Sequence, residues 1–183
     1  MIERIAIIGP ESSGKTTLAK AISDFLGWRL IDEYARDYFQ NQDYSKCSLD
    51  DLIEIAQNQF LLSHNIEQNK YLVSDTEMIT MEIWALDKFG IVPEIITELR
   101  KSQTFDLYIL CKPDMPWQKD ALRTDENRRH LIYKEYQKVI SKSSARYIEL
   151  GGTHIERMIA FIDYLNKNKH INHKRSNVSY DGG

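Results

Sequence analysis

The stretch that most constrains this chain is residues 9–16, which read Gly-Pro-Glu-Ser-Ser-Gly-Lys-Thr. They match G-x-x-x-x-G-K-[ST], the pattern of a phosphate-binding loop. The apolar run at residues 5–8 comes directly before it and is typical of a parallel strand buried on both faces. Residues 17–26 follow with apolar side chains at helical spacing, and Gly27 is a helix stop signal. The order of strand, glycine-rich loop and helix is the context that the motif requires.

The loop residues predict a site for a nucleotide. Gly14 lets the backbone approach a phosphate, because no Cβ stands in the way. The amides at a helix N-terminus favour an anion. We expect Lys15 to reach the β- and γ-phosphates and the Thr16 hydroxyl to bind Mg²⁺. The predicted ligands are ATP and Mg²⁺, and the predicted nucleotide-binding residues of the loop are Gly9, Glu11, Ser12, Ser13, Gly14, Lys15, Thr16 and Thr17. The alternative is a glycine turn followed by an incidental Lys-Thr pair.

Apolar runs alternate with helical stretches along the rest of the chain, which predicts an α/β fold. Strands are expected at 4–8, 28–31, 71–75, 107–110 and 146–150. Helices are expected at 15–26, from 32 onward, at 49–68, 76–89, 93–102, 128–142 and 153–165. This is the plan of a P-loop NTPase, a five-stranded parallel sheet with helices on both faces and a kinase-like lid. Residues 1–165 are predicted to form the domain, and residues 166–183 a polar, flexible tail.

Ligands of such sheets lie beyond the carboxyl ends of the strands. The topology should therefore bring four segments to one crevice, at residues 9–17, 32–38, 74–80 and 111–129. Each of these segments carries polar or charged side chains. We therefore expect the residues that bind and react to lie in these four segments.

Composition excludes several classes of protein. The net charge of -3 indicates no broad nucleic-acid surface, and no apolar run reaches the length of a membrane span. The N-terminus enters a strand at once, so we expect no signal peptide. Cys47 and Cys111 lie far apart and are expected to be free thiols. We expect a cytoplasmic protein with no nucleic-acid or membrane partner, and the sequence leaves its oligomeric state open.

Asp75 ends an apolar strand, as the acid of a Walker B motif does. Its carboxylate can hold Mg²⁺ through water or accept the proton of a substrate hydroxyl. The alternative is a structural role, in which Asp75 is the N-cap of a helix that begins at Thr76.

A second acidic group follows the second strand, where residues 32–36 read Asp-Glu-Tyr-Ala-Arg. The Glu33 carboxylate can accept a hydroxyl proton during phosphoryl transfer, and Tyr34 and Arg36 are expected to bind the same acceptor. The alternative is an acidic helix start with an ion pair between Glu33 and Arg36. The sequence does not decide whether Glu33 or Asp75 is the base.

Residues 123–129 form a cationic segment where small kinases often keep a lid. Lid arginines exclude water and offset the charge of the transferred group, so we expect Arg123 to be catalytic and Arg128 to bind the nucleotide. The alternative is a solvated charged loop. Trp117 can stack on a planar cationic ring or pack beneath the lid. The other two tryptophans, Trp28 and Trp84, are expected in the core.

Four motifs in this order resemble one family. They are E-S-S-G-K within residues 9–17, E-Y-A-R-D-Y at 33–38, S-D-T at 74–76 and P-W-x-x-D-x-L-R at 116–123. Together they resemble the ribosylnicotinamide kinase domain of the NadR family, over residues 2–165. The last three motifs make the likeness far more specific than the first alone. Multifunctional members of that family also carry a nucleotidyltransferase domain, and some a DNA-binding helix-turn-helix; we expect neither in this chain.

The resemblance implies transfer of the γ-phosphate of ATP to the 5′-hydroxyl of nicotinamide riboside, which gives nicotinamide mononucleotide for NAD biosynthesis. Matching the motifs carries the catalytic roles to Lys15, Glu33, Asp75 and Arg123. A kinase for another nucleoside is the nearest alternative. An ATP-binding switch module, whose output is a partner interaction, is the alternative from another class. A GTPase is disfavoured, because Cys-Lys-Pro-Asp at 111–114 replaces the N-K-x-D motif.

Overall fold

The computed structural model describes residues 1–64, 70–117 and 128–168. Its centre is a five-stranded sheet with the order β2-β3-β1-β4-β5, in which all neighbouring strands are parallel. The strands are β1 (Arg4–Ile8), β2 (Arg29–Ile31), β3 (Leu72–Asp75), β4 (Leu107–Cys111) and β5 (Tyr147–Leu150). The predicted fold class is therefore confirmed, and the strands lie where the sequence predicted them.

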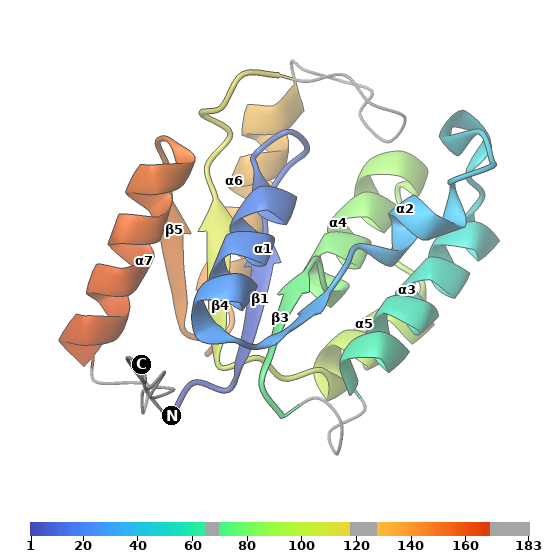
Figure 1. The fold of residues 1–183 in the computed structure, drawn as a ribbon. Helices are drawn as coiled ribbons and strands as arrows, with labels where there is room; N and C mark the ends of the chain where they lie inside the picture. Colours follow the sequence, from blue (N-terminus) through green and yellow to red (C-terminus); the bar gives the residue numbers. More distant parts are fainter. Residues whose placement is uncertain (65–69, 118–127, 169–183) are drawn as a thin grey trace, which may run out of the picture.

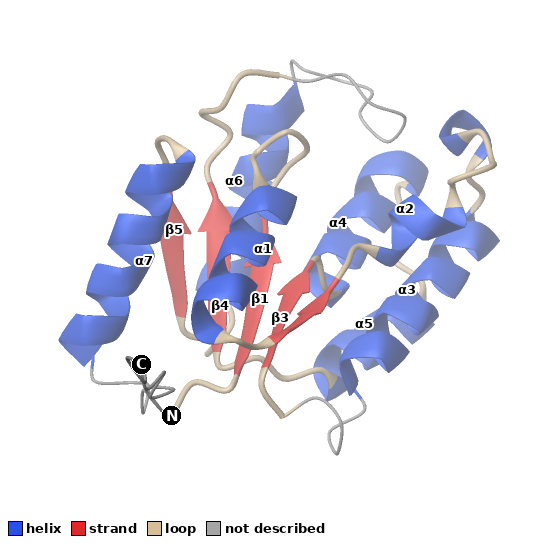
Figure 2. Ribbon diagram, viewed as in Figure 1, coloured by secondary structure: helices blue, strands red, loops and turns tan. Residues whose placement is uncertain are grey.

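Helices cover both faces of this sheet (Figures 1 and 2). The helices are α1 (Lys15–Leu26), α2 (Tyr34–Tyr38), α3 (Leu49–His64), α4 (Met78–Phe89), α5 (Glu94–Ser102), α6 (Arg129–Ser141) and α7 (His154–Asn168), with a 3₁₀ turn at Tyr44–Lys46. Helices α1 and α7 lie on one face and α4 and α6 on the other, while α3 and α5 pack against α4. The last helix ends three residues later than predicted, with the Asn168 side chain donating to the Tyr164 carbonyl at 2.8 Å.

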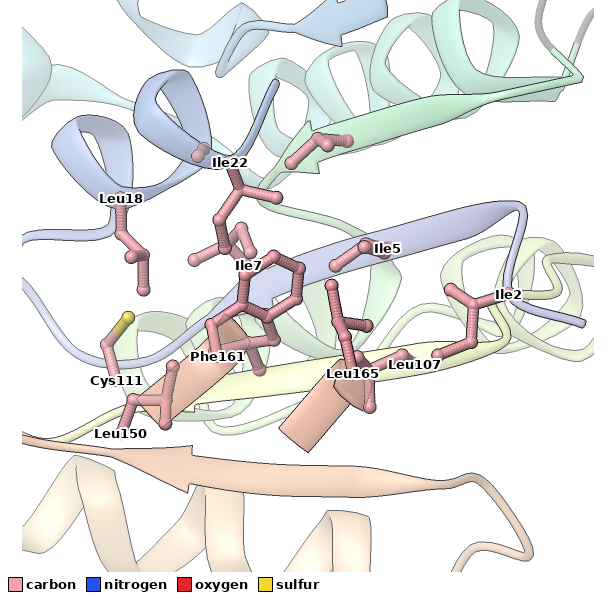
Figure 3. Close-up of a cluster of buried hydrophobic side chains, with 13 residues drawn as sticks. Ile2, Ile5, Ile7, Leu18, Ile22, Leu107, Cys111, Leu150, Phe161 and Leu165 are labelled. Carbon is pink, nitrogen blue, oxygen red and sulfur yellow. The ribbon is translucent and has the colours of Figure 1, made fainter. Parts of the chain in front are cut away.

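The alternation of side chains along β1 explains why its apolar run is continuous. Ile5 and Ile7 belong to the cluster under α1 and α7, which Phe161 completes (Figure 3). Ala6 and Ile8 point the other way, into the cluster under α4 and α6. Since successive side chains of a strand face opposite sides, a central strand between two helix layers is apolar at every position.

A third apolar cluster lies outside the sheet, between α2, α3, α4 and α5. Its fully buried members include Leu52 and Ile55 on α3 and Ile96 on α5. This cluster ties the short helix α2 to the rest of the domain. It thereby fixes the segment after β2, where the second acidic group was predicted.

Local signals in the sequence are visible at the helix ends. Gly27 and Gly90 adopt left-handed conformations and end α1 and α4. At the start of α3, the Ser48 hydroxyl accepts from the Asp51 amide at 3.1 Å, and the Asp51 carboxylate accepts from the Ser48 amide at 2.7 Å. This reciprocal pair is a capping box. Cys47 and Cys111 are both buried and free, as predicted.

None of the helices in the described part of the chain has the length and apolar character needed to cross a bilayer.

Candidate active site

The predicted phosphate-binding loop joins β1 to α1 at the carboxyl edge of the sheet. Gly9 has φ +140, and a Cβ there would lie 2.7 Å from the Cys111 carbonyl oxygen, so only glycine fits. Ser12 and Gly14 also have positive φ, and Gly14 is the N-cap of α1. Because glycine has no capping side chain, the amides of the first turn of α1 remain available for an anion.

The two polar residues that start α1 lie beside these amides. The Lys15 ammonium folds back over the loop and donates to the Pro10 carbonyl at 2.9 Å. Thr16 is exposed and lines the same cavity. The ammonium charge is thus held next to the amides that a phosphate would meet.

A cavity extends from this loop to the helices on the α4 side. It is lined by all of residues 9–17, Glu33, Arg36, Thr80, Trp84, Asp87, Met115, Pro116, Arg128, Arg129, Ile132, Tyr136 and His154. These residues come from each of the four segments that the topology was predicted to bring together. The cavity therefore has a phosphate-binding wall at the loop and a second wall made by α4 and α6.

Glu33 lies on the cavity wall but is only 6% exposed. Its Oε2 atom is 2.9 Å from Nε of Arg36, so the ion pair of the alternative interpretation is present. Arg36 also lines the cavity. Tyr34 does not: its ring packs against Tyr38, with 6.3 Å between centroids. The backbone here is held by the buried Gln59, whose amide oxygen accepts from the Tyr34 amide at 2.8 Å.

Asp75 lies beneath the cavity and is 1% exposed. Neither of its carboxylate oxygens makes a hydrogen bond of normal geometry among the described residues, although the Thr16 hydroxyl lies near enough to lower the pKa of Asp75. Burial, and then the negative charge of Glu33, raise the pKa of Asp75 to about 6, while the positive charge of Lys15 opposes this shift. An ionised Asp75 is therefore costly here unless a cation neutralises it.

These observations fit a magnesium ion. Mg²⁺ prefers oxygen ligands and usually keeps one or two protein groups, with water and phosphate oxygens as the remainder. The unpartnered carboxylate of Asp75 and the hydroxyl of Thr16 supply protein oxygens of this kind. Within residues 1–64, 70–117 and 128–168, no cluster of three or more acidic, histidine or cysteine side chains could hold a metal ion.

The alternative role for Asp75, as the N-cap of α4, is wrong. Glu77 takes that position and accepts from the Ile79 amide at 2.8 Å. Thr76 has φ +83, a left-handed conformation that cannot begin a helix, so α4 starts at Met78. Glu77 is itself buried, which raises its pKa to about 7.

The segment predicted as a lid is only partly described. Arg123 lies outside the described residues, and its catalytic role stays a prediction. Arg128 lies on the cavity wall and pairs with Asp87 of α4. Arg129 donates to the Met115 carbonyl at 3.0 Å, and its guanidinium carbon is 5.8 Å from the centroid of the Trp117 ring.

The tryptophans differ from expectation. Trp117 packs against the arginine at the start of α6 and does not line the cavity. Trp84, expected in the core, packs half-buried against the third apolar cluster and also lines the cavity from α4. Helix α4 buries several of its sides, so its sequence reads as apolar almost throughout. The pattern alone therefore does not tell which aromatic side chain faces a ligand.

Sequence reasoning also missed a polar group on the far wall. His154 begins α7 and lines the cavity, and its Nδ1 atom is buried without a partner among the described residues. Arg157, one turn later, is fully buried and contacts the phosphate-binding loop. Both residues follow the carboxyl end of β5. Ligands of parallel sheets lie beyond the carboxyl ends of the strands, and this rule applies to the segment after β5 as well as to the four segments already chosen. Its position after β5 is therefore the signal that could have identified His154 and Arg157.

The fold and this loop define a P-loop protein. The chain belongs to the AAA domain family, whose model matches residues 4–157. It is also 29% identical, over 134 residues, to the trifunctional NAD biosynthesis/regulator protein NadR of Salmonella typhimurium (strain LT2). The protein of the same name from Escherichia coli (strain K12) matches with the same identity and length. The matched part is 67% of this chain but only 31% of each relative.

Solved structures show the same fold. A NadR protein in complex with NR superposes with a TM-score of 0.75 at 18% identity, covering 95% of this chain and 52% of that one. A NadR protein in complex with NAD and AMP-PNP gives 0.70 at 20% identity, covering 95% and 51%. Deoxyadenosine kinase from M. mycoides gives 0.67 at 15% identity, covering 90% and 99%. The resemblance to the NadR family is thus confirmed in sequence and fold.

Proposed function

We propose that this protein is an ATP-dependent kinase that transfers the γ-phosphate to a hydroxyl of a nucleoside, with nicotinamide riboside as the preferred acceptor. The observation that carries the proposal is the continuous cavity between the phosphate-binding loop and the α4 wall. A nucleotide on the loop leaves the side of the cavity with Glu33, Trp84 and Asp87 for an acceptor. A hydroxyl bound there would face the transferable phosphate, and such positioning supplies much of the catalysis of phosphoryl transfer.

The two carboxylates take different roles in this proposal. Glu33 lines the cavity and is assigned as the group that accepts the proton of the acceptor hydroxyl. Asp75 lies below the wall with unpartnered oxygens and is assigned, with Thr16, to hold Mg²⁺. The metal would neutralise charge on the β- and γ-phosphates when bound. Lys15 would leave the Pro10 carbonyl to contact the γ-phosphate.

The acceptor wall has the character expected for a cationic ring. Nicotinamide riboside carries a positively charged pyridinium, which is attracted to an aromatic face and to a carboxylate. Trp84 supplies an aromatic ring on the cavity wall, and Asp87 of the same helix supplies a carboxylate that is paired with Arg128. The similarity to a NadR protein whose structure was solved with NR supports the same acceptor.

A kinase for another nucleoside is the second candidate. The structure of deoxyadenosine kinase covers 90% of this chain with a TM-score of 0.67, and almost all of that enzyme is matched. A neutral base would gain less from the Trp84 ring than a pyridinium does. The two acceptors therefore differ in the charge that the α4 wall must accommodate.

The experiment is a coupled assay of ADP release with Mg·ATP and a panel of acceptors. The panel holds nicotinamide riboside, nicotinic acid riboside, the common nucleosides and a sample without acceptor, and mass spectrometry identifies the phosphorylated product. Strong stimulation by nicotinamide riboside supports the proposal. Stimulation by another nucleoside keeps the kinase and changes its substrate. Nucleotide binding with equal, slow turnover in every sample would contradict a kinase and favour the switch module.

A further inference from the structure

Arg157 is a buried cation directly behind the phosphate-binding loop. It lies in the first turn of α7, and 0% of its surface is exposed. A guanidinium removed from water must be paired and hydrogen-bonded, because burial of an uncompensated charge is very costly. The hydrogen bonds of Arg157 therefore identify which segments its buried charge connects.

The guanidinium joins three loops of the cavity wall. Its Nε donates to the Gly152 carbonyl at 3.0 Å, and its Nη2 donates to the Lys112 carbonyl at 3.1 Å and to Oδ1 of Asp114 at 2.5 Å. The other oxygen of Asp114 accepts from the Gly152 amide at 2.7 Å. This closed set of bonds fixes the segments after β4 and β5 relative to each other, and it compensates the buried charge.

The remaining bond reaches the phosphate-binding loop itself. Nη1 of Arg157 donates to the Ser13 carbonyl at 2.5 Å. A Cβ on Gly14 would lie 3.4 Å from the same nitrogen, so the guanidinium is packed against the peptide between Ser13 and Gly14. Arg157 thus binds the backbone of the loop and does not line the cavity.

The bond from Arg157 to the Ser13 carbonyl also determines where the Gly14 amide points. The Ser13–Gly14 peptide is trans, and in a planar trans peptide the carbonyl and the next N–H point in opposite directions. Since the Ser13 carbonyl points back to Arg157, the Gly14 amide points away from Arg157. Gly14 itself lines the cavity. Gly14 has no Cβ and can rotate this peptide easily, so an external bond is needed to hold it.

We propose that Arg157 is a positioning residue for the donor phosphates, which holds the Ser13–Gly14 peptide so that the Gly14 amide faces the phosphate before a nucleotide binds. An amide donor fixed in advance stabilises an anion without reorganisation at the moment of binding. Arg157 does not line the cavity, so it would act through the loop. The inference rests on the proposed nucleotide binding and is independent of the identity of the acceptor.

The sequence allows this peptide to be observed alone. Ser13-Gly14 is the only Ser-Gly pair in the chain, so protein labelled with ¹³C′-serine and ¹⁵N-glycine gives one signal in a carbonyl-to-amide NMR correlation. That signal contains the carbonyl that accepts from Arg157 and the amide that should meet the phosphate. We would titrate it with Mg·ADP and measure the ADP affinity by calorimetry.

The test compares wild type, Arg157→Met and Arg157→Lys. The methionine keeps an unbranched apolar stem but cannot bond the Ser13 carbonyl. We expect its ADP affinity to fall about 10- to 100-fold, the worth of one or two hydrogen bonds to a charged group. The Ser13-Gly14 signal should differ before ADP is added and should shift less on binding. The lysine keeps the charge but places its donors on one nitrogen, so we expect a partial loss.

The control is Arg100→Met. Arg100 is a partly buried arginine of α5 that pairs with Glu82, away from the loop, so this variant should lose stability without any change in the Ser13-Gly14 signal. An Arg157→Met protein that is less stable but binds ADP like wild type, with the same Ser13-Gly14 response, would overturn the positioning role. If Arg157→Met does not fold, a wild-type response in Arg157→Lys would overturn it. A wild-type protein without any ADP response would overturn both this inference and the proposed function.

Discussion

Nε of Arg36 lies 2.9 Å from Oε2 of Glu33, so the carboxylate on the acceptor side of the cavity already has a cationic partner. The neighbouring carboxylate of Asp75 has no hydrogen-bond partner in the described part of the chain. The two acids also interact, because the charge of Glu33 raises the pKa of Asp75. A paired acid on the wall and an unpaired acid below it are suited to different tasks, proton transfer and cation binding.

Replacing Glu33 by glutamine should lower kcat about 10²- to 10⁴-fold, the usual contribution of a positioned base. Glutamine has nearly the same shape, so Mg·ADP affinity should stay close to wild type. Steady-state kinetics and calorimetry together check this expectation. Asp32→Asn is the matched control, since Asp32 is the exposed acid next to Glu33 and does not line the cavity. An undiminished kcat in Glu33→Gln would move the role of base to Asp75.

Asp75→Asn should stabilise the ligand-free protein at pH 8. The pKa of Asp75 is raised from 3.8 to about 6 in the folded state. The folded state therefore binds the proton more tightly than the unfolded chain does, and wild-type stability falls as the pH rises from about 4 to about 6. Asparagine removes this loss. We expect a gain of about 3 kcal/mol in the free energy of unfolding at pH 8, which disappears near pH 4.

Urea unfolding of both proteins across this pH range measures the difference. Glu77 also has a raised pKa, of about 7, and is present in both proteins. Its contribution therefore cancels in the comparison. The same Asp75→Asn variant should lose the stabilisation that Mg·ADP gives to wild type. A variant that is less stable than wild type at pH 8 would contradict the assignment of Asp75 as an uncompensated buried acid.

Local patterns explain why so much of the fold was predictable. The apolar run of β1 and the loop at 9–16 are adjacent in sequence, so their relation does not depend on the rest of the chain. The start of α4 was misplaced because Thr76 takes φ +83, a conformation that a threonine does not choose by itself. Its backbone is set by tertiary contacts, such as the bond from the Thr76 amide to the Ile7 carbonyl at 3.1 Å.

The parts of the site that were not predicted depend on long-range geometry. Arg157 reads in the sequence as one more charged residue of an amphipathic helix, yet it contacts Ser13, 144 positions earlier. Trp84 lies on a helix whose pattern is apolar on several sides, so only the position of the cavity tells its role. Asp75 and Glu33 were predicted to lie together because Asp75 ends β3 and Glu33 follows β2, and the topology of a parallel sheet brings the carboxyl ends of its strands to one edge.

Gly9→Ala should destabilise the protein strongly. A Cβ at this position would be 2.7 Å from the backbone oxygen of Cys111, and the φ of +140 is unfavourable for alanine. Backbone strain and a clash with another main chain together should cost about 3 kcal/mol or more. Gly90→Ala is the control, because Gly90 also has positive φ, +72, but open space around it. The free energy of unfolding of Gly90→Ala should fall by only about 1–2 kcal/mol. If urea unfolding gave the same loss for Gly9→Ala and Gly90→Ala, the contact with Cys111 would be unimportant.

Trp84→Leu should weaken the acceptor and leave the donor unchanged. Leucine keeps an apolar side chain on α4 but has no aromatic face for a pyridinium cation. The loss of such a contact is worth about 1–2 kcal/mol, so the KM for nicotinamide riboside should rise about 5- to 30-fold. The KM for ATP should not change, since the phosphate-binding loop forms the opposite wall of the cavity.

The control for that variant is Trp28→Leu, which removes a half-buried tryptophan that packs against Tyr71 outside the cavity. Trp84 also contacts Tyr44, with 5.9 Å between ring centroids, so thermal unfolding of both variants must be compared with wild type. If acceptor affinity depended only on stability, both variants would raise the KM for the acceptor in proportion to their loss of Tm. A rise confined to Trp84→Leu, larger for nicotinamide riboside than for a neutral nucleoside, would identify the α4 wall as the part of the cavity that selects a cationic ring.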